Sequence, residues 1–239
     1  MKKKVVLLVG RDNWTKDLWL NKLLVEHLQA NKVRVVWEDP AAGVIHGLRR
    51  LESRFPWLPE SAKKLNLRLV QLLYAMTHWR YFGYLYQRRE HRNFVESRCK
   101  ALRTTIRRLG CVGELYILSR SSGGRVSSLI ADDFDIRGLI CLSYPFKHPN
   151  LCDEPNRYSH LGTLKTPFLI IQGDKDEYGG LEVTGKYAFS PSVELRFVQG
   201  NHDFKLNDED WQRVVQMICD AIDIPGPRGQ PDADGVACV

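Results

Sequence analysis

The chain has 239 residues, 44% of them hydrophobic, which is enough for one well-packed domain but short for two. No apolar run approaches the length of a membrane span, and the run Val5 to Val9 after the N-terminal lysines is too short for a signal-peptide core, so we expect a cytoplasmic protein. The six cysteines lack C-x-x-C spacing, which favours buried free thiols in a reducing compartment.

Apolar runs and helical patterns alternate along the chain. In chain order we predict a strand at Lys4–Val9, a helix at Lys16–Gln29, a strand at Val33–Glu38 and a helix at Phe94–Leu109. These are followed by strands at Leu115–Leu118, Gly138–Ser143, Phe168–Gln172 and Glu194–Val198, and by a closing helix at Asp208–Ile222. This alternation predicts an α/β fold with one doubly wound, mostly parallel sheet in a single domain over residues 1–224. Residues 225–239 lack periodicity and are predicted to be disordered.

A basic helical insertion at about residues 44–90 interrupts the alternation. Residues 44–110 carry 15 Lys and Arg against 4 Glu, a net charge of +11 against +7 for the whole chain. We expect the part from Val44 to about Gln87 to form a cap over the carboxyl ends of the strands. Its apolar stripe would face the body, and Trp79 and Arg80 would border the pocket mouth and contact the substrate. The stripe consists of Leu65, Leu69, Leu72, Leu73 and Met76.

The same insertion has other interpretations. Interleaved arginines and aromatic rings are often a solvated surface with the rings under arginine stems. The positive charge could instead attract an anionic substrate, an acidic partner or an anionic membrane surface. Nucleic acid is not favoured as a partner.

The most informative motif surrounds Ser121. An apolar run over 115–118 leads into Ser119-Arg120-Ser121-Ser122-Gly123-Gly124, with small residues two positions before and after Ser121. This pattern is typical of a nucleophile elbow, a strained strand-to-helix turn that exposes a serine hydroxyl above a sheet. Gly124 would let the next helix approach the strand closely, and this helix would have a buried stripe of Val126, Leu129 and Ile130.

A serine needs a base and an orienting acid to act as a nucleophile. Asp174 and Asp176 both follow the predicted strand at 168–172, and His202 follows the strand at 194–198. Serine, acid and histidine in this chain order, each after a strand, match the order of a hydrolase triad. Either aspartate could supply the acid on these grounds, and His148 and His160 are expected to be structural or to line a pocket.

The span from Leu115 to Phe204 resembles the small dienelactone-hydrolase-like α/β hydrolases. The family patterns G-x-S-x-G-G-R, L-x-Y-P, R-x-x-H-L, P-x-L-x-x-Q-G-x-x-D and G-x-H-D-F recur here in order, with Ser119 in place of the first glycine. The resemblance implies Ser121 as nucleophile, His202 as base, Asp176 rather than Asp174 as acid, and Tyr144 beside the substrate.

The resemblance also implies an oxyanion hole. Its donors would be the backbone N–H groups of Ser122 and Arg11, although relatives usually carry a His-Gly-rich loop at the second position. A missing donor typically costs ~100- to 1000-fold in turnover. We expect a serine hydrolase of small, possibly anionic esters or thioesters that needs no cofactor or metal, since neither metal-ligand spacing nor a phosphate-binding loop is present. The alternative is a catalytically silent member that binds a partner through the basic segment.

Overall fold

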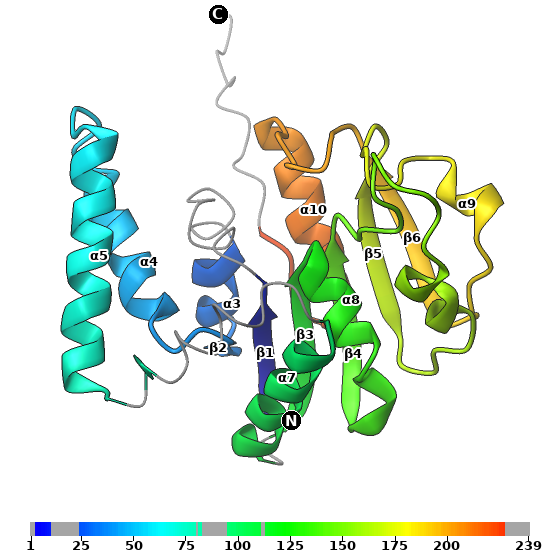
Figure 1. Ribbon diagram of the computed structural model, residues 1–239, viewed down its shortest axis with the longest axis horizontal. Coiled ribbons are helices and arrows are strands. Elements are labelled where there is room, and N and C mark those ends of the chain that lie inside the picture. Colours follow the sequence, from blue (N-terminus) through cyan, green and yellow to red (C-terminus); the bar gives the residue numbers. More distant parts are fainter. Residues whose placement is uncertain (1–2, 11–23, 80, 83–94, 111–112, 228–239) are drawn as a thin grey trace, which may run out of the picture.

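Six parallel strands form the centre of the computed structural model, which describes residues 3–10, 24–79, 81–82, 95–110 and 113–227 (Figure 1). The strand order is β2-β1-β3-β4-β5-β6. The strands are β1 (Lys4–Val9), β2 (Arg34–Trp37), β3 (Glu114–Arg120), β4 (Ile136–Leu142), β5 (Phe168–Gly173) and β6 (Val193–Val198). All six were predicted from the sequence to within two residues, because each is a short apolar run bounded by polar or glycine residues.

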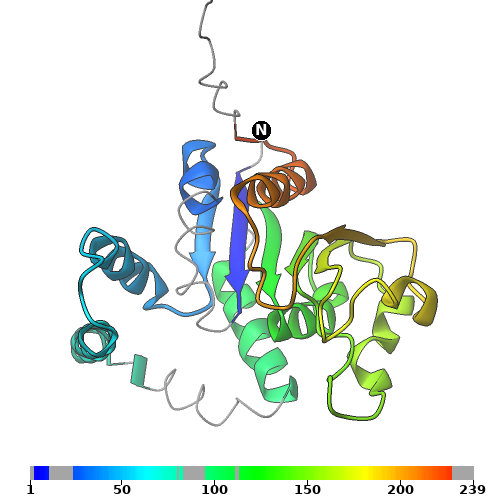
Figure 2. The ribbon, with the colours of Figure 1, turned by 90° about the horizontal axis from the view of Figure 1, so that it is seen from above.

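Helices cover both faces of the sheet. The helices α3 (Glu26–Ala30) and α10 (Asp208–Ala221) lie on one face, and α7 (Val95–Leu109) and α8 (Ser122–Ser128) lie on the other (Figure 2). The short helix α9 (Val183–Lys186) precedes β6, and single 3-10 turns occur at Ala131–Asp133, Pro155–Arg157 and Ser159–Gly162. Successive residues of β1 enter opposite cores: Val6 and Leu8 pack with α3 and α10, whereas Leu7 and Val9 pack with α7 and α8. This two-sided burial explains why the strands read as continuous apolar runs.

Some sequence predictions need correction or fall outside the described residues. Val126 and Ile130 of the α8 region are buried as predicted, but Leu129 is 37% exposed. Cys99, Cys141 and Cys219 are buried free thiols, while the free Cys152 is exposed. The first part of the predicted helix at 16–29 and the tail from 228 lie outside the described residues. None of the helices in the described ranges is long and apolar enough to cross a membrane.

The helical insertion differs most from its prediction. The structure forms α4 (Ala42–Glu52) and α5 (Glu60–Thr77), and both lie beside the β2 edge of the sheet in Figures 1 and 2, not above the carboxyl ends of the central strands. The leucine stripe points to solvent, and each of its five residues is at least 48% exposed. The opposite face of α5 makes the contact instead: Leu67, Tyr74 and Ala75 pack against Ile45 of α4 and against Ala41, which directly precedes α4. Most of the Arg-rich segment beyond Trp79 lies outside the described residues.

Candidate active site

Ser121 occupies the sharp turn between β3 and α8. Its backbone is in the left-handed region, with φ 51° and ψ −124°, which is strained for a residue with a side chain. The strain is held by backbone hydrogen bonds: Ser121 N donates to Leu142 O at 2.9 Å, and Gly124 N donates to Ser121 O at 2.8 Å. The turn therefore fixes the direction of the Ser121 hydroxyl before any substrate arrives.

Small residues are needed around this turn because α8 lies very close to the sheet. A Cβ atom on Gly123 would lie 2.7 Å from Val9 O, and one on Gly124 would lie 2.2 Å from Cys141 Sγ. Ser119 is fully buried and its Oγ donates to Ile140 O at 2.9 Å, so the hydroxyl is satisfied inside the sheet. Burial raises the pKa of the Cys141 thiol to about 12, which keeps this neighbour of the turn uncharged.

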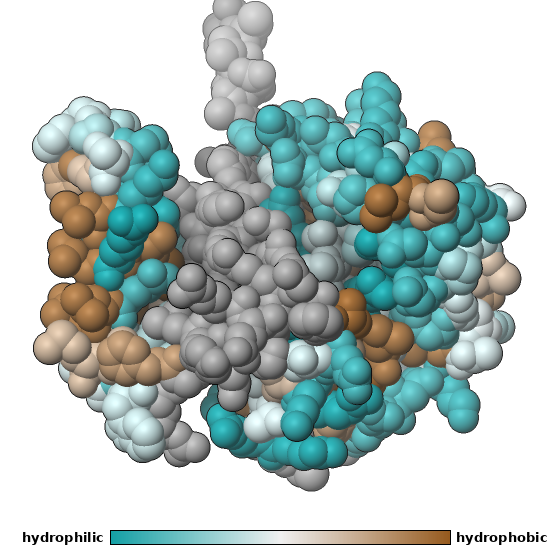
Figure 3. Space-filling model, in the orientation of Figure 1, coloured by the Kyte–Doolittle hydropathy of each residue, from teal (hydrophilic) through white to brown (hydrophobic). Residues whose placement is uncertain are grey.

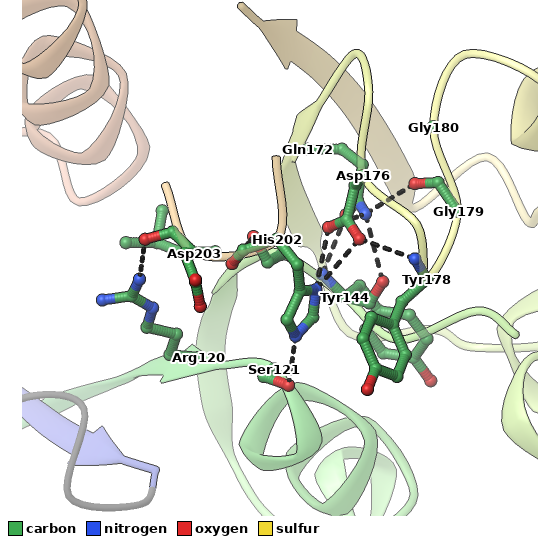
Figure 4. Close-up of polar contacts among 12 residues, drawn as sticks. Arg120, Ser121, Tyr144, Gln172, Asp176, Tyr178, Gly179, Gly180, His202 and Asp203 are labelled. Carbon is green, nitrogen blue, oxygen red and sulfur yellow. Dashed lines mark hydrogen bonds and ion pairs between the residues drawn. The ribbon is translucent and has the colours of Figure 1, made fainter. Parts of the chain in front are cut away.

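The hydroxyl of Ser121 meets the imidazole of His202. Ser121 Oγ lies 2.9 Å from His202 Nε2, and His202 Nδ1 lies 2.9 Å from Asp176 Oδ2 and 3.0 Å from Asp176 Oδ1 (Figure 4). The expected hydrogen-bonding reach between Ser121 and His202 is confirmed by the first distance. The three side chains follow β3, β5 and β6, and the parallel sheet brings the carboxyl ends of these strands to one edge.

Asp176 is buried and accepts a hydrogen bond from the side chain of Gln172. Gln172 Nε2 donates to Asp176 Oδ2 at 2.8 Å and to Gly179 O at 2.7 Å, while Gln172 Oε1 accepts from Tyr144 N at 2.8 Å. Tyr178 N donates to the other carboxylate oxygen, Asp176 Oδ1, at 2.8 Å. The carboxylate thus accepts from three donors, and Figure 4 shows it pointing at the imidazole edge. Fixed donors of this kind hold the carboxylate in one orientation.

Asp174 is directed elsewhere. Its Oδ1 accepts from Gly200 N at 2.9 Å, which ties the end of β5 to the loop that carries His202. A Cβ atom on Gly173 would lie 2.5 Å from Gly200 O, so the two loops also touch through their backbones. The structure places Asp176 beside the histidine, as the resemblance implied, and Asp174 in the loop contact.

Two further side chains anchor the loop of His202, and the sequence reasoning singled out neither. Arg120, which directly precedes Ser121, is buried, and its Nη2 donates to Asp203 O at 2.6 Å (Figure 4). Ser143 Oγ, just after β4, donates to His202 O at 3.1 Å. Both follow or end a strand at the same sheet edge as Ser121, so the rule that functional side chains gather there would have found them.

Ser122 is the first residue of α8, and the first backbone N–H groups of a helix have no intrahelical acceptor. Ser122 Oγ accepts from Arg98 Nη1 of α7 at 2.8 Å. Nearby, Gly10 N donates to Glu38 Oε2 at 3.2 Å; burial raises the pKa of the Glu38 carboxyl, while the Arg98 charge lowers it. Arg11, the second predicted oxyanion donor, lies outside the described residues. Neither Arg98 nor Glu38 was expected from the sequence.

The structure describes two of the three residues predicted to contact a substrate. Tyr144 is fully buried, and its hydroxyl donates to Arg157 O at 2.6 Å, so its ring packs in the core beside Phe146 and Phe168. Trp79 lies just beyond α5 and is 78% exposed, and Arg80 lies outside the described residues. A substrate contact by these three residues stays a prediction. The Tyr178 ring lies beside the His202 ring, with 4.3 Å between ring centroids.

A second serine–histidine pair occurs in the structure. Ser128 Oγ lies 2.8 Å from His160 Nε2, and it also donates to Arg125 O at 3.1 Å. Burial and the Arg125 charge lower the pKa of His160 to about 4, so this imidazole is neutral at pH 7. Within the described residues no carboxylate orients it, and Ser128 ends a helix instead of a strained turn. We assign this pair a structural role, which is one of the two roles expected for His160 from the sequence.

The Ser121–His202 pair has the geometry that activates a serine, and the Ser128–His160 pair does not. A hydroxyl at hydrogen-bond distance from an imidazole whose far nitrogen faces a carboxylate is the arrangement that makes serine nucleophilic. No group of three or more His, Cys, Asp or Glu suited to a metal occurs among the described residues.

Comparisons with known proteins agree with this geometry. The sequence profile of the family described as "Alpha/beta hydrolase domain" matches residues 59–224. The fold is similar to an esterase domain from Rhodothermus marinus, with a TM-score of 0.53 at 12% identity, covering 91% of this chain and 86% of that one. A protein of the alpha/beta hydrolase superfamily from Xanthomonas campestris pv. campestris gives a TM-score of 0.52 at 15% identity, covering 92% and 96%. With the elbow, the parallel sheet and the profile match in agreement, the chain belongs to the α/β hydrolase family.

Proposed function

We propose that this protein is a serine hydrolase that cleaves a small ester or thioester through an acyl-enzyme on Ser121. The observation that carries the proposal is the hydrogen-bonded series from Ser121 Oγ through His202 to Asp176, with distances of 2.9 Å at both steps. Esterases among proteins of similar fold, such as the domain from Rhodothermus marinus, support the choice of an ester over other bonds.

In the proposed reaction His202 Nε2 accepts the proton of Ser121 as Oγ bonds to the carbonyl carbon of the substrate. The carbonyl oxygen becomes an oxyanion, which the N–H of Ser122 at the start of α8 would stabilise. When the oxyanion collapses, the bond to the leaving oxygen or sulfur breaks, and the imidazolium returns the proton to that atom. Water then loses a proton to His202 and attacks the acyl group, which leaves as an acid and restores Ser121. Asp176 holds the imidazole in the required tautomer throughout.

An anionic group on the substrate is part of the proposal. The helices α4, α5 and α7 carry more Lys and Arg than Glu, and this excess of positive charge would attract a carboxylate or phosphate on the acyl chain. A cytoplasmic location is also proposed, since the three buried free cysteines fit a compartment in which thiols stay reduced.

Covalent labelling tests the proposal without knowledge of the substrate. The wild-type protein should react with a fluorophosphonate probe, and peptide mass spectrometry should place the adduct on Ser121. Ser121→Ala should abolish labelling, whereas the matched variant Ser128→Ala, which alters the other serine–histidine pair, should retain it. A wild-type protein that remains unlabelled, or an adduct on another serine, would contradict the proposal and favour the catalytically silent alternative.

A further inference from the structure

The outer face of α5 is apolar and open to solvent. Five residues of the helix form one stripe, since their spacing of four, three, one and three positions returns to the same side of a helix. They are 48% to 69% exposed, and Figure 3 shows apolar side chains gathered over this helix. The stripe consists of Leu65, Leu69, Leu72, Leu73 and Met76. A contiguous apolar surface of this kind marks a binding site in a folded protein.

The stripe is not the face that attaches α5 to the protein. That attachment uses the opposite side, where Leu67 and Tyr74 pack beside α4, and Asn66 Nδ2 donates to Glu52 Oε1 at 3.2 Å. A surface helix normally turns polar residues to solvent once its inner face is buried. Here the helix is apolar on both sides, so the outer face has a second use. Among the described elements, α5 is the outermost at the β2 edge in Figures 1 and 2.

Charge around the stripe selects an anionic occupant. Lys64 and Arg68 are exposed and each directly precedes a leucine of the stripe, so they border it along one side. Glu60 is the one acidic residue of α5, and it is ion-paired with Lys63 at 2.7 Å. Two copies of the chain packed in parallel through this face would bring Lys64 and Arg68 of each copy near those of the other, which like-charge repulsion disfavours.

A tryptophan lies near each end of α5. Trp57 lies three residues before α5 and is 76% exposed, and Trp79 lies two residues after it and is 78% exposed. Tryptophan prefers the headgroup region of a bilayer, where its ring is partly apolar and its N–H stays hydrated. An apolar helix face bordered by lysine and arginine, with tryptophan at its ends, is the composition of a helix that lies in a membrane interface.

We propose that the outer face of α5 docks the protein on the surface of an anionic lipid bilayer. The leucine stripe enters the headgroup and acyl boundary, Lys64 and Arg68 contact anionic headgroups, and the sheet domain stays in water. The binding is peripheral, since it uses one helix lying along the surface. It is independent of the chemistry at Ser121, because no residue of the stripe belongs to that site.

Vesicle flotation of the full-length protein tests this. Wild type should bind vesicles containing about 30 mol% phosphatidylglycerol in phosphatidylcholine more tightly than pure phosphatidylcholine, with weaker binding at high salt. The double variant Lys64→Gln/Arg68→Gln should lose about 30-fold in affinity for the anionic vesicles at low salt. Its matched control, Lys100→Gln/Arg108→Gln on α7, removes two exposed charges elsewhere and should bind like wild type to within a few-fold.

The apolar contribution is tested with Leu69→Gln/Leu72→Gln/Met76→Gln, which keeps good helix formers at exposed positions. This variant should lose about 100-fold or more in vesicle affinity, while its circular dichroism and unfolding midpoint stay unchanged. The control Leu151→Gln/Leu181→Gln removes leucines of similar exposure from other loops and should bind normally.

Three outcomes would overturn the proposal. The first is a wild-type protein that does not float with anionic vesicles. The second is binding that survives the triple substitution. The third is a concentration-dependent dimer in sedimentation that the triple substitution dissolves without any vesicle binding, which would assign the face to a second copy. A loss of labelling at Ser121 would not affect these results, so the proposal fails separately from the proposed hydrolase function.

Discussion

Replacing Asp176 with asparagine probes the part of the site that depends most on the tertiary structure. The carboxylate accepts from three donors: Tyr178 N at 2.8 Å, Gln172 Nε2 at 2.8 Å and His202 Nδ1 at 2.9 Å. An asparagine has one acceptor oxygen, and its amide nitrogen must take the other position. That NH2 group then faces either the Tyr178 N–H or the Gln172 NH2. Two hydrogen-bond donors therefore face each other in the buried site, and one of them loses its acceptor.

Two effects follow. A buried donor without an acceptor costs about 1–3 kcal/mol, so the free energy of unfolding should fall by that amount. The asparagine NH2 can be satisfied by His202 Nδ1 only if the imidazole changes tautomer, and Nε2 then carries the proton and cannot accept one from Ser121. For the corresponding change in another serine hydrolase kcat falls about 10⁴-fold, and we expect a loss of that order here, equivalent to about 5 kcal/mol.

The measurement is the rate of fluorophosphonate labelling, together with hydrolysis of p-nitrophenyl acetate and urea unfolding. Asp174→Asn is the matched control, because an amide oxygen can still accept from Gly200 N and labelling should stay nearly unchanged. The reasoning is refuted if folded Asp176→Asn labels at more than about a tenth of the wild-type rate, or if Asp174→Asn is the more damaging change.

Further expectations concern the elbow, the loop of His202 and the second histidine. Gly124→Ala should lower the urea unfolding free energy by about 1–3 kcal/mol, because its Cβ would lie 2.2 Å from Cys141 Sγ; an unchanged midpoint would contradict this. Arg120→Met removes the hydrogen bond to Asp203 O and should reduce kcat about tenfold with little change in KM, with partial rescue by lysine; a change in KM alone would argue against a positioning role. The pKa of His160 is about 4 in the folded protein, against 6.5 for an ordinary histidine, so the unfolded chain binds the proton first as pH falls and stability is lost between pH 6.5 and 4. His160→Gln should reduce that acid-induced loss by about 2–3 kcal/mol in urea unfolding at pH 7 and pH 4.5, and an identical pH dependence in both proteins would exclude the linkage.

Much of the fold was predictable from the sequence. Helices cover both faces of the parallel sheet, so each strand is buried on both sides and appears in the sequence as a short, continuous apolar run. The positions of Ser121 and His202 were also predictable. Each directly follows such a run, and parallel strands bring their carboxyl ends to one edge.

Residue spacing alone did not choose between Asp174 and Asp176; the resemblance to the hydrolase family favoured Asp176, and the structure places Asp176 beside His202. Two other features needed the tertiary structure. The hydrogen bond from Arg98 to Ser122 joins residues of two separate helices, so neither residue alone signals it. The leucine stripe of α5 shows that the helix has an apolar face, but a periodic pattern does not say what covers that face. The contacts with α4 decided that the other side packs inward and that the stripe meets solvent, because Tyr74 and Leu67 fit against Ile45.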